Sequence, residues 1–448
     1  MREFIRPDRK QYSLLPPSIE EWLPENHLAR FVVEICDQLD LTKIYNQYGL
    51  SGSPPYDPRM LLGLLFYGYS TGVFSSRKIE TASYDSVAFR YISGNLHPDH
   101  DTIANFRKQY LSEIGELFVQ ILVIARTMGF LKVGKVNIDG TKIQANASKH
   151  KAMSYERIVL LEQQYKEEIA RLLTLADQAD SEANLELDIP AEMQRREVRL
   201  AKIKQAKEAL EARAKERHRL EKAEYDEKMK ARQEKEKASG KKIKGKKPKP
   251  PEEGPKPKDQ YNFTDPESRI MKTADGFDQC YNAQAAVTEQ MLITGAYANA
   301  HCNDKEELLP VLDSIPKQAG QVETAAADTG YFSEKNVTGT LQRGIDPYIA
   351  VGRQAHNQWL DQYLAQEQQS ESDPTASPTE LMSQKLKTEK GRSVYRLRKM
   401  TVETVFGIIK EIMGFRRFSL RGEQAANGEW LLVCASFNLK RLFNLSAG

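Results

Sequence analysis

The stretch KVNIDGTKIQAN, residues 135–146, marks the point where the chain changes from helical to strand-like sequence. It is short, rich in β-branched residues and ends in turn-forming residues, which is typical of a β-strand. Four later segments share this pattern: YNAQAAVTE (281–289), MLITGAYANA (291–300), VETAAADTG (322–330) and DPYIAVG (346–352). A helical segment, DKEELLPVLDSIPKQ, lies between the second and third of them. We therefore expect an α/β domain with a mixed sheet, against which the amphipathic C-terminal helix containing Trp430 packs.

The residues before this strand, 1–130, have the periodicity of helices. In HLARFVVEICDQLDL, apolar side chains recur on one helical face: Leu28, Phe31, Val32, Ile35 and Leu39. The stretch SGSPPYDPRMLLGLLFYGYSTG has turn signals on both sides of an apolar helix, and TIANFRKQYLSEIGELFVQILVIARTMGF is amphipathic. We expect a helical N-terminal domain over residues 1–130. Composition alone leaves open whether this bundle also contacts DNA.

A long insertion, residues 152–258, separates the first predicted strand from the second. Two thin apolar stripes run through a segment of mostly Glu, Lys, Arg, Gln and Ala, which predicts a hairpin of two antiparallel helices. The following GKKIKGKKPKPPEEGPKPKD is rich in Lys and Pro, so we expect a flexible linker whose lysines either stay solvated or touch phosphates. The sheet domain then comprises residues 131–151 and 259–448. Within it, AQEQQSESDPTASPTE (365–380) is expected to loop out before the C-terminal helices.

Composition excludes several classes of protein. The chain has 448 residues, and 65 Lys plus Arg against 62 Asp plus Glu give a formal charge of +3, which rules out a uniformly basic coat. Its four cysteines contain no CxxC pair, so neither a disulfide framework nor a thiolate zinc site is expected. No apolar stretch reaches the roughly 18 residues of a membrane span, and the start lacks a signal peptide. We expect a cytoplasmic protein with no membrane partner.

Three carboxylates occupy positions where chemistry is plausible. Asp139 lies inside the first predicted strand, Asp328 ends a later one, and Glu403 lies on a helix with Lys410 two turns further along. Carboxylates that converge at strand ends and a facing helix suit hard divalent cations such as Mg²⁺. Two such ions, about 3.5–4 Å apart, activate an attacking oxygen and stabilise a leaving one in phosphoryl transfer. Taken singly, each aspartate also fits a turn or helix cap, and the Glu–Lys pair also fits a solvated surface.

Basic residues concentrate around Glu403. Between Gly391 and Gly422 there are eight basic and two acidic residues, a local charge of 8 − 2 = +6. A same-sign cluster beside carboxylates is expected where phosphates must approach metal ions. The residues that we expect to contact DNA are Arg396, Lys399, Arg416, Arg417 and Arg421, with the basic pair Arg107 and Lys108 in the N-terminal helices.

The chain resembles the DDE transposases of bacterial insertion sequences, which have a ribonuclease-H-like catalytic core. The stretches that carry the resemblance, in order, are YDPRMLLGLLFYGYSTGVFSSRKIE, NLHPDHDTIANFR, NIDGTKIQANASKH, TDPESRIMKTADGFDQCYNAQAAV, ADTGYFSEKN and TVETVFGIIKEIMGFRRFSLRG. The resemblance implies that Asp139, Asp328 and Glu403 hold two Mg²⁺ ions, with Mn²⁺ as a substitute. It also implies that Lys410 is the catalytic lysine of a Tyr–Arg–Glu–Lys signature.

The sequence departs from that signature at its first two letters. Tyr395 and Arg398 keep their mutual spacing, but each lies one position too far from Glu403. If one helix continues through this region, Arg396 and Lys399 share the face of Glu403 instead. We therefore expect those two residues at the site.

The function implied by the resemblance is strand cleavage and strand transfer at the ends of an insertion sequence. The expected partners are double-stranded DNA, both as terminal inverted repeats and as target, and a second copy of the chain, since two ends must meet. The expected location is the bacterial cytoplasm, at the nucleoid. Two alternatives stay open: a related nuclease or resolvase that cleaves without joining strands, and an inactive DNA-binding scaffold derived from a transposase.

Overall fold

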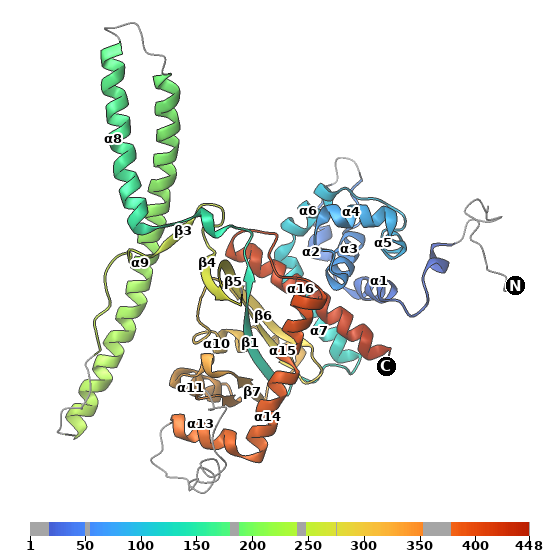
Figure 1. Cartoon of the computed structure of the whole chain (residues 1–448). Helices are drawn as coiled ribbons and strands as arrows, with labels where there is room; N and C mark the ends of the chain where they lie inside the picture. The colour runs from blue at the N-terminus through green and yellow to red at the C-terminus, as the bar shows by residue number, and fades with distance from the viewer. Residues whose placement is uncertain are drawn as a thin grey trace, which may run out of the picture. The chain divides into compact units, whose positions relative to one another are not determined.

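The computed structural model describes residues 18–49, 54–179, 188–239, 248–274, 276–352 and 378–447. The chain forms two compact units, one made of residues 1–146 with 270–448 and the other of residues 147–269 (Figure 1). Three expectations lie wholly or mostly outside the described residues: the turn of the helical hairpin, the first half of the Lys/Pro-rich linker, and the loop at 365–380.

The first unit begins with helices, as the sequence predicts. They are α1 (Leu28–Gln38), α2 (Thr42–Tyr45), α3 (Pro58–Thr71), α4 (Ser76–Asp85), α5 (Val87–Ile92), α6 (His100–Gln109) and α7 (Leu111–Thr127). Helix α3 shows how the local sequence determines where a helix begins and ends. The Asp57 carboxylate accepts a hydrogen bond from the Arg59 N–H, and Pro58 stands where its missing N–H costs nothing. The helix ends at Gly72, whose φ of +85° suits glycine.

The mixed sheet of the first unit contains every strand that the sequence predicts. Its strands are β1 (Lys135–Gln144), β4 (Arg269–Thr273), β5 (Gly276–Thr288), β6 (Ile293–Asn299), β7 (Thr324–Ala327) and β8 (Asp346–Ile349). The order is β4-β5-β1-β7-β8, and β6 pairs with β5. Strand β5 is antiparallel to both β1 and β6, whereas β7 is parallel to both β1 and β8. The α/β fold with helices before a mixed sheet is therefore confirmed.

Helices flank the strands of this sheet. Helices α10 (Leu308–Asp313) and α11 (Glu334–Gln342) lie in the connections before and after β7, and α13 (Pro378–Lys387), α14 (Glu389–Met400) and α15 (Val402–Gly407) follow β8. A π-helix, η5 (Ile408–Ile412), continues α15, and α16 (Glu423–Ser446) closes the chain. Burial on both faces explains why β7 is a run of small, mostly apolar residues, Thr-Ala-Ala-Ala.

Helix α16 covers the outer edge of the sheet. The side chain of Asn438 accepts a hydrogen bond from the Ile293 N–H (2.9 Å) and donates one to the Ile293 carbonyl (2.8 Å). Asn427 accepts one from the Ala298 N–H at 2.9 Å. These amides satisfy backbone groups that an edge strand would otherwise present to other chains. The expected packing of Trp430 is confirmed, because its indole N–H donates to the Gln284 carbonyl at 3.0 Å.

The same helix joins the N-terminal helices to the sheet. The Ser70 hydroxyl of α3 donates to the Ser436 carbonyl at 2.8 Å, and the Tyr69 hydroxyl donates to Glu429 at 2.9 Å. The compact units of the structure therefore do not separate residues 1–130 from the sheet domain. The reason is that α16 buries one face against β6 and another against α3 and α7, which periodicity within residues 1–130 does not reveal.

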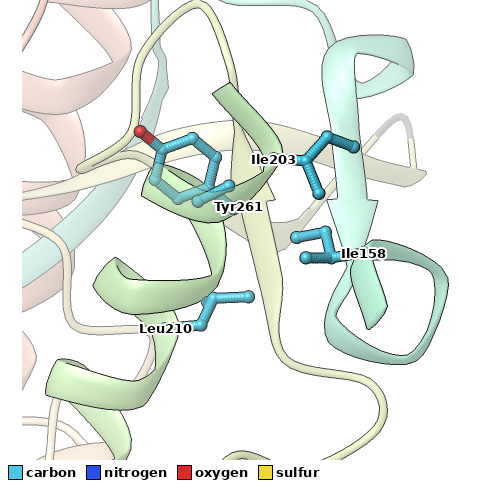
Figure 2. Packing of buried hydrophobic residues seen from close by; sticks show 5 residues of the cluster. Ile158, Ile203, Leu210 and Tyr261 are labelled. Atoms are coloured by element: carbon cyan, nitrogen blue, oxygen red, sulfur yellow. The ribbon is translucent and has the colours of Figure 1, made fainter. Parts of the chain in front are cut away.

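The second unit is built on the helical hairpin. Helices α8 (Tyr155–Ala179) and α9 (Ile189–Ser239) pack side by side, and β2 (Ala152–Ser154) pairs with β3 (Gln260–Asn262) at the start of α8. Figure 2 shows the apolar contact between Ile158 of α8, Ile203 and Leu210 of α9, and Tyr261 of β3. Ion pairs flank it: Glu162 binds Lys207 at 2.8 Å, and Arg196 binds Glu168 at 2.7 Å.

The expectation of a flexible linker is wrong for its C-terminal part. Arg217 of α9 binds the Asp259 carboxylate at 3.0 Å and the Gly254 carbonyl at 3.3 Å. The carbonyls of Pro257 and Asp259 accept hydrogen bonds from the first backbone N–H groups of α8. A proline-rich segment cannot form a helix, but its carbonyls are free to satisfy the donors that a helix start leaves unpaired.

Within the described parts of the chain, no helix has both the length and the apolar composition needed to cross a membrane.

Candidate active site

Two of the predicted carboxylates lie side by side at the centre of the sheet. Strand β1 pairs with β7 as far as Ile138 and Ala327, so Asp139 and Asp328 are the next residues on the two parallel strands. Asp139 remains within β1, opposite Ala285 of β5. Asp328 follows the end of β7 and accepts a hydrogen bond from the Gly330 N–H at 2.8 Å, which caps the short helix η4 (Thr329–Tyr331). Parallel pairing thus brings together two residues that are 189 positions apart.

The third carboxylate, Glu403, comes from the helices that follow the sheet. Helix α14 ends at Met400 and α15 begins at Val402. Between them, Thr401 has φ −115° and ψ −85°, which is not helical, and the chain changes direction there. Glu403 therefore lies in the first turn of α15, where a negative charge is favoured by the helix dipole.

Arg398 joins two of the carboxylates. One guanidinium nitrogen, Nη1, lies 2.9 Å from Asp139 Oδ2, and the other, Nη2, lies 2.6 Å from Glu403 Oε1. The residue is buried, with 8% of its surface exposed, and its Nε has no hydrogen-bond partner in the described part of the chain. The ring of Tyr395 lies 5.8 Å from its Cζ. Tyr395 and Arg398 are thus both at the site.

This arrangement corrects the expectation drawn from an unbroken helix. Arg396 and Lys399 are exposed on α14, and Arg398 takes the place beside Glu403 that was expected for them. The physical reason is the break at Thr401, which changes the rotation of α15 relative to α14. Arg398 and Glu403 are one residue further apart than in the Tyr–Arg–Glu–Lys signature. The break accommodates this extra residue, so the arginine still contacts the glutamate.

The electrostatics of the site show that the three acids share one neighbourhood. Burial raises the pKa of Asp139 to about 6; Arg398 opposes that shift, whereas Asp328 and Glu403 reinforce it. For Arg398, burial acts to lower the pKa, but Asp139, Tyr395 and Glu403 outweigh it, so the pKa rises and the guanidinium stays charged. The site therefore accumulates negative charge that a cation must balance, and Arg398 supplies that cation.

Lys410 contacts β1 beyond the position of Asp139. It belongs to the π-helix η5, a form of helix that is frequent at functional sites. Its Nζ donates to the carbonyl of Lys142 at 3.1 Å, three residues beyond Asp139. Burial lowers the pKa of Lys410. The lysine is thus held against the backbone of the strand that carries Asp139.

Most of the predicted DNA contacts are exposed, and several follow the end of β1. Arg417 binds the Gln144 side chain at 2.9 Å, and Arg421 Nε donates to the Asn146 carbonyl at 3.1 Å. Arg416 pairs with Glu411. Lys108 on α6 is also exposed.

Arg107 is an exception, and the expectation that it contacts DNA is wrong. Its side chain is buried, with one nitrogen 2.8 Å from the Tyr69 hydroxyl and 3.1 Å from the Phe74 carbonyl. Helix periodicity explains the difference from its neighbour, because Arg107 follows the apolar face of Ile103 and Phe106 and Lys108 does not.

The donor set fits a hard divalent cation, but its present arrangement holds an arginine instead. Carboxylate oxygens are the ligands that Mg²⁺ prefers, and here two partly buried aspartates and one exposed glutamate supply them. Among the described residues, however, no three His, Cys, Asp or Glu side chains lie close enough together to hold a metal ion. Arg398 accounts for this, because its guanidinium separates Asp139 from Glu403. A metal ion bound by all three acids therefore requires Arg398 to move aside.

Sequence reasoning missed one part of the site. Asp304, Asn282, Gln284 and Lys142 form a polar cluster next to Gly140, the residue that follows Asp139. Two amide residues between apolar ones, Asn282 and Gln284 in YNAQAAV, were the signal that could have located it.

Comparison with known proteins shows that two parts of the chain are similar to transposase domains. Residues 17–109 match a transposase domain (DUF772), and residues 240–439 match a transposase DDE domain. The second match contains Asp328, Glu403 and Lys410. The chain is 35% identical, over 79 residues, to a putative transposase for insertion sequence element IS402 of Burkholderia cepacia, a stretch that covers 16% of this chain and 36% of that protein. No solved structure matches the chain.

Proposed function

Since the chain belongs to the DDE transposases of insertion sequences, we propose that it binds the ends of an insertion sequence and catalyses metal-dependent strand cleavage and strand transfer. The observation that carries this proposal is the convergence of Asp139, Asp328 and Glu403 around the guanidinium of Arg398. The sheet supports it too. Three antiparallel strands followed by two parallel ones, with an acid at the centre of β1 and another after β7, agree with a ribonuclease-H-like core.

Asp139, Asp328 and Glu403 would hold the Mg²⁺ ions, or Mn²⁺ in their place. When bound, such ions activate the attacking oxygen and stabilise the leaving oxygen of the phosphodiester. The reaction then has two steps. Water attacks a phosphorus at the element end and breaks one P–O bond, which frees a 3′-OH. That hydroxyl next attacks a phosphorus of the target DNA, so one P–O bond replaces another and no nucleotide cofactor is consumed.

The remaining residues of the site have roles that follow from their positions. Arg398 neutralises Asp139 and Glu403 until metal ions and DNA arrive. Lys410, on η5 and hydrogen-bonded to the backbone of β1, orients a phosphate. Arg416, Arg417 and Arg421 extend the positive charge along the end of that strand, where a DNA backbone would continue. Exposed Arg396, Lys399 and Lys108 are further candidates for phosphate contact.

Substitution of Asp328 tests the active site. The variant Asp328→Ala should lose detectable Mg²⁺-dependent cleavage of a duplex that carries the element end, while it binds that duplex about as well as the wild type. The matched control is Asp313→Ala, because Asp313 is an exposed aspartate whose ion pair is with Arg343, away from the site. Cleavage by Asp328→Ala at the wild-type rate would falsify the metal-site assignment.

A strand-transfer assay tests the second step. A pre-cleaved duplex with a labelled 3′-OH should become joined to target DNA by the wild type and not by Asp328→Ala. If the wild type cleaves element ends but never joins the labelled strand, the protein is a nuclease and not a transposase.

Two element ends must be held together, so we further propose a homodimer in which the hairpin α8–α9 makes part of the contact. Large apolar side chains on both helices are exposed, among them Leu160 and Val198. Deletion of residues 155–235 should convert a dimer to a monomer, measured as mass in solution by light scattering. A dimer that survives the deletion removes this role from the hairpin.

A further inference from the structure

A polar cluster lies on the side of β1 opposite to Arg398. Successive residues of a strand face opposite sides of a sheet, so Gly140 and Lys142 face away from the side of Asp139. On that side, a single oxygen of Asp304, Oδ1, accepts three hydrogen bonds. They come from Asn282 Nδ2 at 2.6 Å, Gln284 Nε2 at 2.8 Å and Lys142 Nζ at 3.1 Å.

These groups are costly to bury, which argues that their arrangement matters. Asn282 and Gln284 are fully buried in the middle of β5, where their pairing partners on β1 are Lys142 and Gly140. A buried amide destabilises a fold unless it is hydrogen-bonded, and an apolar pair would fill the same space without that requirement. Asp304 precedes α10 and brings its carboxylate to both amides.

The cluster is tied closely to Asp139. A Cβ atom at Gly140 would lie 2.2 Å from Gln284 Nε2 and 2.8 Å from Asp304 Oδ1, distances that no real side chain shows. Glycine next to Asp139 therefore leaves the space in which the side chains of Gln284 and Asp304 pack against the strand. Asp304 thus contacts β1 on both sides of Thr141, by packing beside Gly140 and by its bond to Lys142.

The cluster is also tied to Asp328. The buried hydroxyl of Tyr331, in η4, donates to Gln284 Oε1, and so links the turn after Asp328 to the amide that Asp304 binds. A Cβ atom at Gly330 would lie 3.8 Å from Asp304 Cβ, and the Gly330 N–H donates to Asp328. Burial raises the pKa of Tyr331 well above its ordinary value, and the charges of Asp304, Asp139 and Asp328 add to that shift.

We propose that Asp304 is a positioning residue, which sets the spacing of Asp139 and Asp328 by holding β1 and η4 to one carboxylate oxygen. The proposal rests on the proposed function, because it assigns Asp304 to the metal site of that reaction. Asp304 acts through the backbone beside Gly140 and through Gln284 and Tyr331. Groups that orient metal ligands in this way commonly change metal affinity by about 10-fold to 100-fold when they are removed.

The experiment compares Mn²⁺ binding by the full-length wild type, Asp304→Ala and Tyr331→Phe, measured by electron paramagnetic resonance with and without an element-end duplex. We expect Asp304→Ala to weaken Mn²⁺ binding by about 10-fold or more. Tyr331→Phe keeps the ring in the core and removes only the link to Gln284, so it should weaken binding in the same direction but less. Raised Mn²⁺ should restore the cleavage rate of both variants towards the wild-type kcat, as expected for misplaced but intact ligands.

Two control variants and a measurement of thermal stability separate the outcomes. Asp313→Ala removes an exposed aspartate and should bind Mn²⁺ as the wild type does. If Asp304→Ala and Tyr331→Phe bind Mn²⁺ with wild-type affinity, or if either loses only thermal stability with affinity unchanged, the positioning role is overturned. If instead the wild type and Asp139→Asn bind Mn²⁺ equally weakly, the metal site itself is wrong, and the proposed function fails before Asp304 is judged.

Discussion

The first unit contains two arginine–carboxylate networks that differ in their access to solvent. In one, Arg398 binds Asp139 and Glu403, whose side chains are 19% and 43% exposed. In the other, Arg107 binds the Tyr69 hydroxyl, which donates to Glu429, and both Tyr69 and Glu429 are fully buried. The oxygens of Glu429 also accept hydrogen bonds from Ser419 and Leu420. The buried network joins α3, α6 and α16. In the network of Arg398, by contrast, the Glu403 carboxylate is accessible to solvent.

The difference teaches how one chemical pairing serves two purposes. A buried charge that loses its partner cannot be solvated by water, so it strongly destabilises the fold. The Arg107 network must therefore stay intact to hold α3, α6 and α16 together. Arg398 can release Glu403 to solvent or to a cation at a lower cost, because that carboxylate already faces solvent. We therefore expect the first network to determine stability and the second to determine how the site takes up metal ions.

The largest expected effect is on the buried network. Glu429→Ala removes the acceptor of Tyr69, Ser419 and Leu420 and should lower the free energy of unfolding by about 3–5 kcal/mol, measured by urea denaturation. Glu429→Gln keeps one acceptor oxygen and should cost less. A loss below about 1 kcal/mol for the alanine variant would mean that the two networks do not differ in the way described.

The second prediction concerns Arg398. Arg398→Ala removes the guanidinium that competes with a cation for Asp139 and Glu403, so Mn²⁺ affinity should rise roughly tenfold, the equivalent of one charged hydrogen bond. Titration calorimetry checks this, with Arg396→Ala, an exposed arginine of the same helix, as the control. Weaker Mn²⁺ binding by Arg398→Ala would show that the arginine supports the ligands and does not compete for them.

The third prediction separates the exposed arginines that follow the end of β1 from an exposed arginine elsewhere in the first unit. Arg417→Ala and Arg421→Ala should each reduce the slope of log K against log salt, for binding of a DNA duplex, by about 1. Arg343→Ala, which removes an exposed arginine paired with Asp313, should leave the slope unchanged. Fluorescence anisotropy at several salt concentrations measures the slopes. Equal slopes for all three variants and the wild type would show that Arg417 and Arg421 do not contact DNA phosphates.

The smallest effect is expected at a third pairing, between an exposed histidine and a buried glutamate. His301 lies 2.7 Å from Glu307, and this hydrogen bond raises the pKa of His301. Burial acts to raise the pKa of Glu307, but hydrogen bonds from His301 and Tyr297 lower it overall. The contribution of His301 to stability is present below its unfolded pKa of about 6.5 and is lost as pH rises through the folded value. That of Glu307 is present above about 4.3 and is lost as pH falls through its folded value.

The stabilisation by this pair should therefore be largest between about pH 4.3 and 6.5. Because the His301 side chain is 67% exposed, the difference in unfolding free energy between the wild type and His301→Asn should stay under about 1 kcal/mol there. It should shrink towards pH 9, as measured by thermal melting across this range. A difference that grows with pH would show that the hydrogen bond does not depend on a charged imidazole.

Much of the site could be anticipated because it depends on residue type and strand ends. Asp139 and Asp328 stand out as charges in apolar strands, and parallel pairing of β1 with β7 does the rest. Arg398 could not be placed in the same way, since its position depends on a single non-helical residue, Thr401. Asp304 lies in a polar connection without any pattern of its own, and only its contacts with Gln284 and Gly140 reveal its place.

The sequence by itself determined the strands, the helical hairpin and the three acids, because periodicity and the cost of a charge inside a strand are local properties. Only the tertiary structure decided which cation sits among those acids, which arginine is buried, and which residue supports the site from behind. Arg398, Arg107 and Asp304 find partners 259, 38 and 20 to 162 positions away. Partners at such separations are selected by how helices and strands pack, and no short stretch of sequence encodes that.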